Sequence, residues 1–297
     1  MSKKKNSLKL WVEGARLRTL PLAIAPVAIG AGAAAAAQAS NIGLDLLALA
    51  VALFLQIGVN FANDYSDGIR GTDTKRVGPL RLTGSKSVRP EAVKFAAFAF
   101  FALAGLAGLA IVLITALWWL IAVGAAAILA AWFYTGGKRP YGYAGLGELA
   151  VFVFFGLVAT IGTSFIQVRE INGPELFGGI SAGLFASAVL MVNNIRDREL
   201  DQHVGKRTLS VMIGRKASLV VFLLMLWIPF VLLAMQVTIY PATFFAYAAV
   251  FLAIPATLIV LTAKTPKELI LVLKLTSFAA LGYGILLGWG LAVVNFG

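Results

Sequence analysis

Residues 44–73 read LDLLALAVALFLQIGVNFANDYSDGIRGTD, an apolar run that ends abruptly in acidic residues. The apolar part covers Leu44–Asn63, and a helix of about 20 mostly apolar residues is long enough to cross the hydrocarbon core of a bilayer. The sequence therefore predicts a membrane-spanning helix whose polar end carries Asp64, Asp67 and Asp73.

The same alternation of long apolar runs and short polar stretches fills the whole chain. Of its 297 residues, 60% are hydrophobic and 13% are charged, and the mean hydropathy of +0.89 is outside the range of soluble domains. We predict an all-α polytopic membrane protein, a single domain over residues 1–297, with about nine helices around a central cavity. The predicted spans are Leu20–Ala37, Leu44–Asn63, Glu91–Ile114, Leu117–Thr135, Glu148–Val168, Leu176–Ile195, Ala217–Gln236, Pro241–Ala263 and Leu269–Val294.

The distribution of basic residues predicts how the chain is oriented. The formal net charge is +12, and the nine spans place 24 of the 25 Lys and Arg residues on one side, with only Arg169 on the other. Because Lys and Arg collect in cytoplasmic loops, we predict a cytoplasmic N-terminal segment (1–18), cytoplasmic loops at 64–90 and 196–216, and an external C-terminus. This topology explains most of the positive charge without a nucleic-acid partner.

A second span ends in an acidic motif that resembles the first. Residues 193–201 read NNIRDRELD, and Asn193, Asp197 and Asp201 follow one another at steps of four, so they share one face of a helix. Asn193 lies 133 residues after Asn60, as Asp197 lies 133 residues after Asp64. The shared offset indicates two pseudo-repeated halves whose motifs face one another, as in other repeat-built membrane proteins.

Carboxylates at the inner ends of membrane helices need neutralising partners, because an isolated charge is costly in hydrocarbon. Magnesium is held in proteins by one or two carboxylates together with phosphate oxygens and water. Two facing motifs would therefore hold Mg²⁺ that bridges to a diphosphate, with neighbouring Arg and Lys pairing with the remaining phosphate charge. The alternative is that each motif is a solvated helix end whose acids pair with adjacent basic residues.

Three further strings extend the pattern: TDTKRVGPLRL at 72–82, YTGGKRPYGYAGLGE at 134–148 and VGKRTL at 204–209. With the paired motifs, the chain resembles the UbiA-type intramembrane prenyltransferases, and among them those that act on 1,4-dihydroxy-2-naphthoate. The resemblance implies Mg²⁺-dependent transfer of a polyprenyl group from polyprenyl diphosphate to this aromatic acceptor, with decarboxylation, in a bacterial plasma membrane. The product would be demethylmenaquinone.

The resemblance also implies roles for the motif residues. Asp64, Asp67, Asp197 and Asp201 are expected to be the metal ligands and catalytic acids, and Asn60 and Asn193 to bind the diphosphate. The commoner pattern of the family has a further Asp where this chain has Gly68. Either neighbouring acid, Asp67 or Asp73, is a candidate to replace it.

Other candidates lie in the loops. The basic candidates for diphosphate contact are Lys138, Arg139, Lys206, Arg207, Arg76 and Arg81. Tyr134 either stacks on the cation or the ring or is an aromatic residue at the membrane interface. Glu148 either acts on the acceptor hydroxyl or caps a helix. Rival functions are a prenyltransferase for 4-hydroxybenzoate, homogentisate or a tetrapyrrole, and a secondary transporter.

Overall fold

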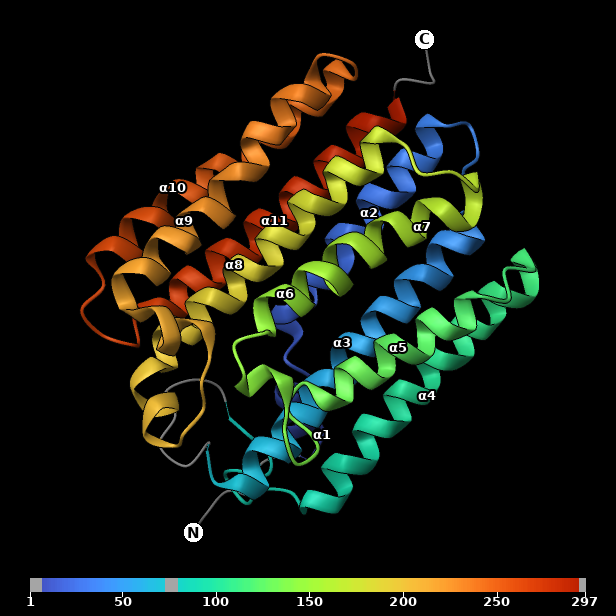
Figure 1. Ribbon diagram of the computed structural model, residues 1–297. Coiled ribbons are helices and arrows are strands. Elements are labelled where there is room, and N and C mark those ends of the chain that lie inside the picture. The colour runs from blue at the N-terminus through green and yellow to red at the C-terminus, as the bar shows by residue number, and fades with distance from the viewer. Residues whose placement is uncertain (1–6, 73–79, 294–297) are drawn as a thin grey trace.

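The computed structural model describes residues 7–72 and 80–293, and within them every regular element is a helix (Figure 1). The α-helices are α1 (Ser7–Ala15), α2 (Pro21–Ala36), α3 (Ile42–Arg70), α4 (Pro90–Thr115), α5 (Leu120–Phe133), α6 (Gly147–Val151), α7 (Ala159–Val168), α8 (Gly173–His203), α9 (Leu209–Val237), α10 (Val250–Thr262) and α11 (Leu269–Ala292). Short 3₁₀ segments are η1 (Leu17–Thr19), η2 (Tyr141–Tyr143) and η4 (Pro241–Ala249), and a π-helical segment, η3 (Phe152–Val158), joins α6 to α7. The prediction of an all-α chain is confirmed.

Each predicted span coincides with a helix, but not every helix is a full span. Seven helices of the described chain are long and apolar enough to cross a membrane. An eighth is obtained if the pair Leu8–Thr19 and Pro21–Ala36, bent by 49°, counts as one span. The remaining segment, α5, has only 14 residues. A helix of that length rises about 21 Å, which is shorter than a hydrocarbon core of about 30 Å.

The two motif helices are longer than a bilayer requires. With 29 and 31 residues, α3 and α8 exceed the about 20 residues of a spanning segment, so their last turns extend beyond the apolar region. Figure 1 shows that both helices end at the same end of the bundle, where α1 also lies. The fold therefore brings the two acidic motifs, which are far apart in the sequence, to one end of the molecule.

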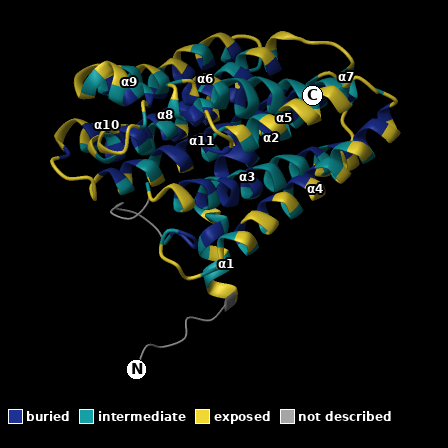
Figure 2. Ribbon diagram, turned by 60° about the horizontal axis from the view of Figure 1, so that its bottom comes forward, coloured by how far each residue is buried: buried dark blue, intermediate teal, exposed yellow. Residues whose placement is uncertain are grey.

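The outer surface of the bundle is apolar, whereas α2, α8 and α11 carry many buried residues. Figure 2 shows exposed residues along the outer faces of α4, α5, α9 and α10. Large apolar side chains on these helices are open to the surroundings, for example Phe95 at 76% and Phe251 at 80% exposure. Such a surface suits lipid rather than water.

Glycines allow the inner helices to approach closely. A Cβ atom on Gly32 of α2 would lie 2.1 Å from the carbonyl oxygen of Gly288 in α11. A Cβ atom on Gly156 of η3 would lie 2.4 Å from the Cα of Gly183 in α8. Only glycine fits at these contacts, in agreement with the small residues that membrane helices place where they cross.

Candidate active site

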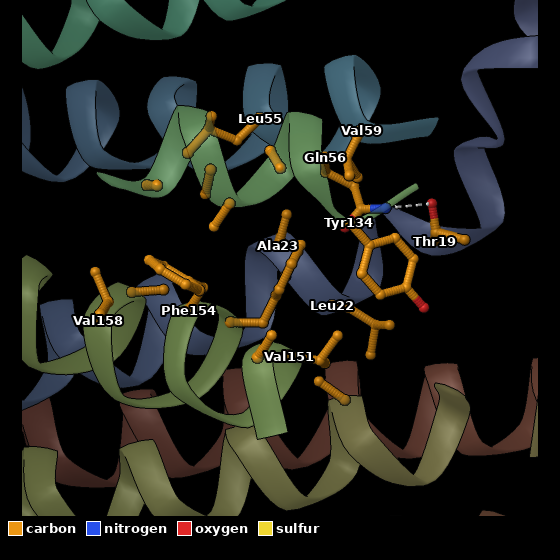
Figure 3. Close-up of a pocket in the computed structure, with 18 of the residues that line it drawn as sticks. Thr19, Leu22, Ala23, Leu55, Gln56, Val59, Tyr134, Val151, Phe154 and Val158 are labelled. Carbon is orange, nitrogen blue, oxygen red and sulfur yellow. Dashed lines mark hydrogen bonds between the residues drawn. The ribbon is translucent and has the colours of Figure 1, made fainter. Parts of the chain in front are cut away.

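A cavity of about 670 Å³ lies between the helices beside both acidic motifs. Figure 3 shows apolar side chains from several helices lining it, among them Leu55, Phe154 and Val158. Tyr134 also lines the cavity, as do Gln56 and Thr19, which are joined by a hydrogen bond of 3.0 Å from Nε2 to Oγ1 (Figure 3). The charged and amide side chains in its wall include Arg16, Arg18, Asn60, Asn63, Asp67, Arg81, Asn193, Asn194, Arg196 and Lys206. The cavity is thus polar beside the motifs and apolar elsewhere.

Asp64 of the first motif anchors the loop that follows α3. Its carboxyl group is fully buried, and its two oxygens each accept a backbone hydrogen bond of 2.8 Å, from the N–H groups of Leu82 and Thr83. The residue was predicted as a metal ligand. The structure shows that its carboxylate also holds the backbone of the following loop. Each carboxylate oxygen has a second lone pair, so the two roles are compatible.

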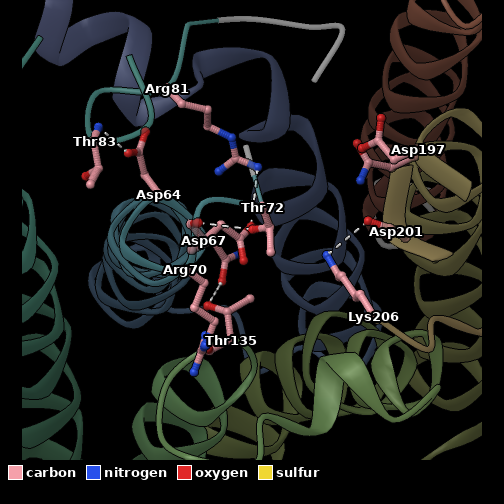
Figure 4. A network of polar contacts seen from close by, with 12 residues as sticks. Asp64, Asp67, Arg70, Thr72, Arg81, Thr83, Thr135, Asp197, Asp201 and Lys206 are labelled. Atoms are coloured by element: carbon pink, nitrogen blue, oxygen red, sulfur yellow. Dashed lines mark hydrogen bonds and ion pairs between the residues drawn. The ribbon is translucent and has the colours of Figure 1, made fainter. Parts of the chain in front are cut away.

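Asp67 is the acid of the first motif that faces the cavity. Its Oδ1 accepts a hydrogen bond of 2.7 Å from the hydroxyl of Tyr143. Its Oδ2 lies 3.8 Å from Nη2 of Arg81, and Figure 4 shows Arg81 and Asp67 side by side. Arg81, one of the basic candidates from the sequence, therefore lies at the candidate site. Asp73 and Arg76 lie outside the described residues.

Gly68 is required by the fold of the same loop. A Cβ atom at this position would lie 2.5 Å from Cβ of Thr83 and 3.0 Å from the backbone nitrogen of Gly84. An Asp side chain does not fit there unless the loop moves. The loop held by Asp64 thus occupies the space that the commoner acid would need.

Asn60 joins the first motif to the start of the chain. Its Nδ2 donates hydrogen bonds of 3.0 Å to the carbonyl oxygen of Ala15 and 2.9 Å to Oγ1 of Thr19. Its Oδ1 accepts one of 3.3 Å from Gln56. The side chain lines the cavity, so this network fixes the wall where α1, η1 and α3 meet.

The second motif contains an internal ion pair. Arg196 donates from Nε to Asp197 Oδ1 at 2.7 Å and from Nη2 to Asp197 Oδ2 at 2.6 Å. The same Nη2 also lies 2.8 Å from Oδ1 of Asn193. Two of the predicted motif residues are thus held by a guanidinium group that the sequence analysis did not single out. The sequence did contain a signal for Arg196, because this residue lies inside the motif, directly before Asp197.

Lys206 and Tyr143 link the two motifs. Nζ of Lys206 lies 3.9 Å from Asp201 Oδ1 (Figure 4). The same atom lies 4.9 Å from the ring centroid of Tyr143, which is a cation–π distance. Cζ of Arg70 also lies close to this ring, 5.4 Å from its centroid. Burial, and then the nearby charge of Asp67, raise the pKa of Tyr143 above its ordinary value, so the phenol is a neutral donor. Tyr143 was not a sequence candidate, although it lies in the string 134–148.

The other sequence candidates take different positions. Lys138, Arg139 and Arg207 are exposed, and within the described chain none of them lines the cavity. Glu148 is buried behind the wall, where its Oε1 accepts a hydrogen bond of 2.8 Å from Asn194, which does line the cavity. Glu148 therefore reaches the cavity through Asn194.

The acids offer a suitable but incomplete set of ligands for magnesium. In residues 7–72 and 80–293, no group of three or more His, Cys, Asp or Glu side chains is arranged to hold a metal by itself. Each motif contributes one or two carboxylates, and Mg²⁺ usually takes its remaining ligands from phosphate oxygens and water. The donor chemistry thus fits a hard cation that binds together with a diphosphate.

Comparison with known proteins gives consistent matches over nearly the whole chain. The model of the UbiA prenyltransferase family matches residues 23–278. A 1,4-dihydroxy-2-naphthoate octaprenyltransferase of Mycobacterium tuberculosis is 46% identical over 289 residues, which cover 97% of this chain and 97% of the relative. An enzyme of the same name from Escherichia coli is 36% identical over 210 residues, covering 69% and 68%.

Solved structures share the fold at lower identity. A UbiA homolog from Archaeoglobus fulgidus bound to GPP and Mg²⁺ is 16% identical, with a TM-score of 0.65 over 93% of this chain and 98% of that one. The apo structure of a UbiA homolog from Aeropyrum pernix gives a TM-score of 0.68 at 16% identity, over 94% and 98%.

Proposed function

Because this chain belongs to the UbiA prenyltransferase family, we propose that it transfers a polyprenyl group from polyprenyl diphosphate to 1,4-dihydroxy-2-naphthoate, giving demethylmenaquinone. It is an aromatic prenyltransferase and an integral membrane protein. The observation that carries the proposal is the cavity, which places an apolar chamber beside a cluster of acids and bases. This arrangement suits a donor with an anionic head and a long hydrocarbon tail.

The acidic motifs are the proposed binding site for Mg²⁺ and the diphosphate. Asp64, Asp67, Asp197 and Asp201 would hold the metal, which when bound neutralises negative charge on the leaving diphosphate. Among the described residues, the bases that lie beside these acids are Arg81, Arg196 and Lys206. Their charges stabilise the departing group in a site already shaped for it.

The protein's other contribution is to protect and orient the reacting carbons. When the allylic C–O bond breaks, its electron pair leaves with the diphosphate, and the apolar wall keeps water from the cation. The ring of Tyr134, in the same wall, offers its π face to positive charge. The acceptor carbon that bears the carboxylate then forms the new C–C bond. This carbon then loses CO₂, instead of the proton that an unsubstituted ring carbon would lose, and the ring becomes aromatic again.

Product analysis tests the proposal. Membranes containing the protein are incubated with Mg²⁺, octaprenyl diphosphate and one acceptor at a time, and products are identified by mass spectrometry. We expect a prenylated naphthoquinol that lacks the carboxyl group, and no product from an Asp67→Asn variant. Prenylation of 4-hydroxybenzoate, homogentisate or a tetrapyrrole instead would replace the proposed acceptor. Absence of transfer to every acceptor would favour the secondary transporter.

The finer topology belongs to the same proposal. We place the chain in a bacterial plasma membrane with nine spans in two pseudo-repeated halves, α5 being the shortest, and with the N-terminus and both motifs on the cytoplasmic side. The distribution of Lys and Arg supports this orientation, because only Arg169 then lies outside.

A further inference from the structure

We propose that Arg196 takes the place of the metal ion in the second motif while the site is empty, and transfers to the diphosphate when metal and substrate bind. The inference rests on the proposed function, because it concerns the same metal and the same anion. It assigns to Arg196 two roles: it keeps the carboxylate of Asp197 in position before the metal binds, and it couples the binding of the metal to that of the diphosphate.

The guanidinium of Arg196 holds the oxygens that a cation would use. Its fork contacts both carboxylate oxygens of Asp197 at 2.6 and 2.7 Å, and Oδ1 of Asn193 at 2.8 Å. The side chain of Arg196 is only 1% exposed, so this charge lies inside the protein rather than at its surface. A cation that enters between Asn193 and Asp197 must compete with it.

The first motif is built differently at the equivalent acid. Asp64 is held by the backbone N–H groups of Leu82 and Thr83, which cannot leave unless the loop moves. Asp197, at the same position of the repeat, is contacted by a long side chain that can rotate away. Of the two equivalent acids, Asp197 is therefore the one whose ion pair a local movement of Arg196 can break.

One nitrogen of Arg196 indicates where the side chain goes. Nη1 is buried and has no hydrogen-bond partner in the described part of the chain, although the residue lines the cavity. A buried N–H without a partner is unfavourable, whereas a guanidinium forms strong hydrogen bonds to phosphate oxygens. An anionic donor in the cavity would satisfy this group and take up the charge released from Asp197.

The exchange predicts that metal and diphosphate bind cooperatively. Without diphosphate, metal affinity is lowered by the fraction of molecules in which Arg196 occupies the motif. With diphosphate, Arg196 has an alternative anion, and the motif is open to the metal. An arginine with a purely structural role gives no such coupling, because its loss would lower the affinity for the metal and the affinity for the diphosphate together.

The test measures binding on purified protein, without turnover. Mn²⁺ affinity is determined by electron paramagnetic resonance in the absence of diphosphate, and binding of geranyl S-thiolodiphosphate by equilibrium dialysis at saturating Mg²⁺. In Arg196→Met we expect Mn²⁺ to bind roughly tenfold more tightly and the diphosphate analogue roughly tenfold more weakly. Arg196→Lys, which keeps the charge but not the fork, is expected to change both in the same directions by less.

Arg198→Met is the matched control. Arg198 lies on the same helix and its Nε contacts the carbonyl oxygen of Ser210 at 3.3 Å, outside the cavity. This variant loses the same charge, and we expect neither affinity to change. An unchanged or weaker Mn²⁺ affinity in Arg196→Met and Arg196→Lys, with a melting temperature like that of the parent protein, overturns the inference.

A further variant separates this inference from the proposed function. Asp197→Asn is expected to lose Mn²⁺ binding if the second motif is a metal site. If Asp197→Asn binds Mn²⁺ like the parent protein, the proposed metal site is wrong. If it loses the metal while Arg196→Met shows no gain, the metal site stands and only the exchange by Arg196 is wrong.

Discussion

The hydroxyl group of Tyr143 donates a hydrogen bond of 2.7 Å to Oδ1 of Asp67, across 76 positions of the sequence. The ring of the same tyrosine lies against Lys206, which approaches Asp201. One side chain from the loop between α5 and α6 therefore contacts the first acidic motif directly and the second through Lys206. This geometry makes Tyr143 a positioning residue for Asp67.

Tyr143→Phe is expected to lower kcat/KM by roughly tenfold, because a hydrogen bond to a charged group contributes about 1.5–3 kcal/mol. Phe keeps the ring that Lys206 contacts, so the change isolates the hydroxyl. Tyr143→Leu, which also removes the ring, is expected to lose more. The measurement is prenyl transfer at varied diphosphate concentration, and an unchanged kcat/KM in Tyr143→Phe would contradict the assigned role.

The pH dependence of this variant gives a second check. Burial and the charge of Asp67 raise the pKa of Tyr143 above its ordinary value of 10.0, so its proton is retained at lower pH. The stability contribution of the neutral phenol is therefore complete below pH 10.0 and is lost as the pH rises above that value. The ratio of kcat/KM between the parent protein and Tyr143→Phe should be constant between about pH 6 and 9.

Gly68→Ala is expected to destabilise the protein, because the new Cβ would lie 2.5 Å from Cβ of Thr83. Overpacking of this kind typically costs about 1–3 kcal/mol. Thermal unfolding in detergent measures the effect. Adding Thr83→Gly should recover part of the loss, because it removes the side chain that the new Cβ meets.

Gly124→Ala is the control, since a Cβ on Gly124 has no atom within 4 Å. Equal melting temperatures for Gly68→Ala and Gly124→Ala would contradict the packing argument.

Gly162→Leu tests whether the apolar part of the cavity holds the prenyl tail. Gly162 of α7 lines the cavity, and a Cβ there meets nothing within 4 Å, so a larger side chain extends into the empty space. We expect KM for octaprenyl diphosphate to rise at least several-fold while KM for geranyl diphosphate stays nearly constant, because only a long tail needs this space.

The control for the tail experiment is Gly282→Leu. Gly282 of α11 is equally open, but it lines a separate groove on the outside of the bundle. This change should leave both KM values near those of the parent protein. If Gly162→Leu raises KM equally for the long and the short donor, the tail does not reach α7.

The helices were predictable because their signal is local. A run of about 20 apolar residues has few stable conformations in a bilayer other than a helix, and all nine runs are helical. The number of full spans was harder to predict from the sequence than the helices themselves. The predicted segment Leu117–Thr135 contracts to a 14-residue helix because Leu117–Trp119 and Tyr134–Thr135 are not part of α5. Hydropathy alone does not show that the apolar segment is longer than the helix it forms.

The contacts within the site were less predictable. The acidic motifs appear in the sequence, but the partners of Asp64 and Asp67 depend on the path of the following loop and on Tyr143. Conversely, Lys138 and Arg139 fit the expected pattern and yet are exposed. A basic residue in a loop has the same local appearance whether it points inward or outward, so only the tertiary structure separates Arg81 from Arg139.

The position of Lys138 relative to the membrane decides whether α5 is a span. The sequence contains no cysteine, so a single introduced cysteine reports one position without background. Glu170 and Lys267 are exposed, and they follow α7 and precede α11, on the proposed outer and inner sides. In intact cells, a membrane-impermeant maleimide should label Glu170→Cys, and should label Lys267→Cys only after the membrane is disrupted.

Lys138→Cys then gives the decisive result. Although α5 rises only about 21 Å, a bilayer accommodates a short helix by local thinning at modest cost. We therefore expect α5 to cross and Lys138→Cys to behave like Lys267→Cys. Labelling of Lys138→Cys in intact cells would mean that α5 returns to the side from which it starts. In that case α5 would not cross the membrane. The nine-span topology and the inner placement of Tyr143 would both be wrong.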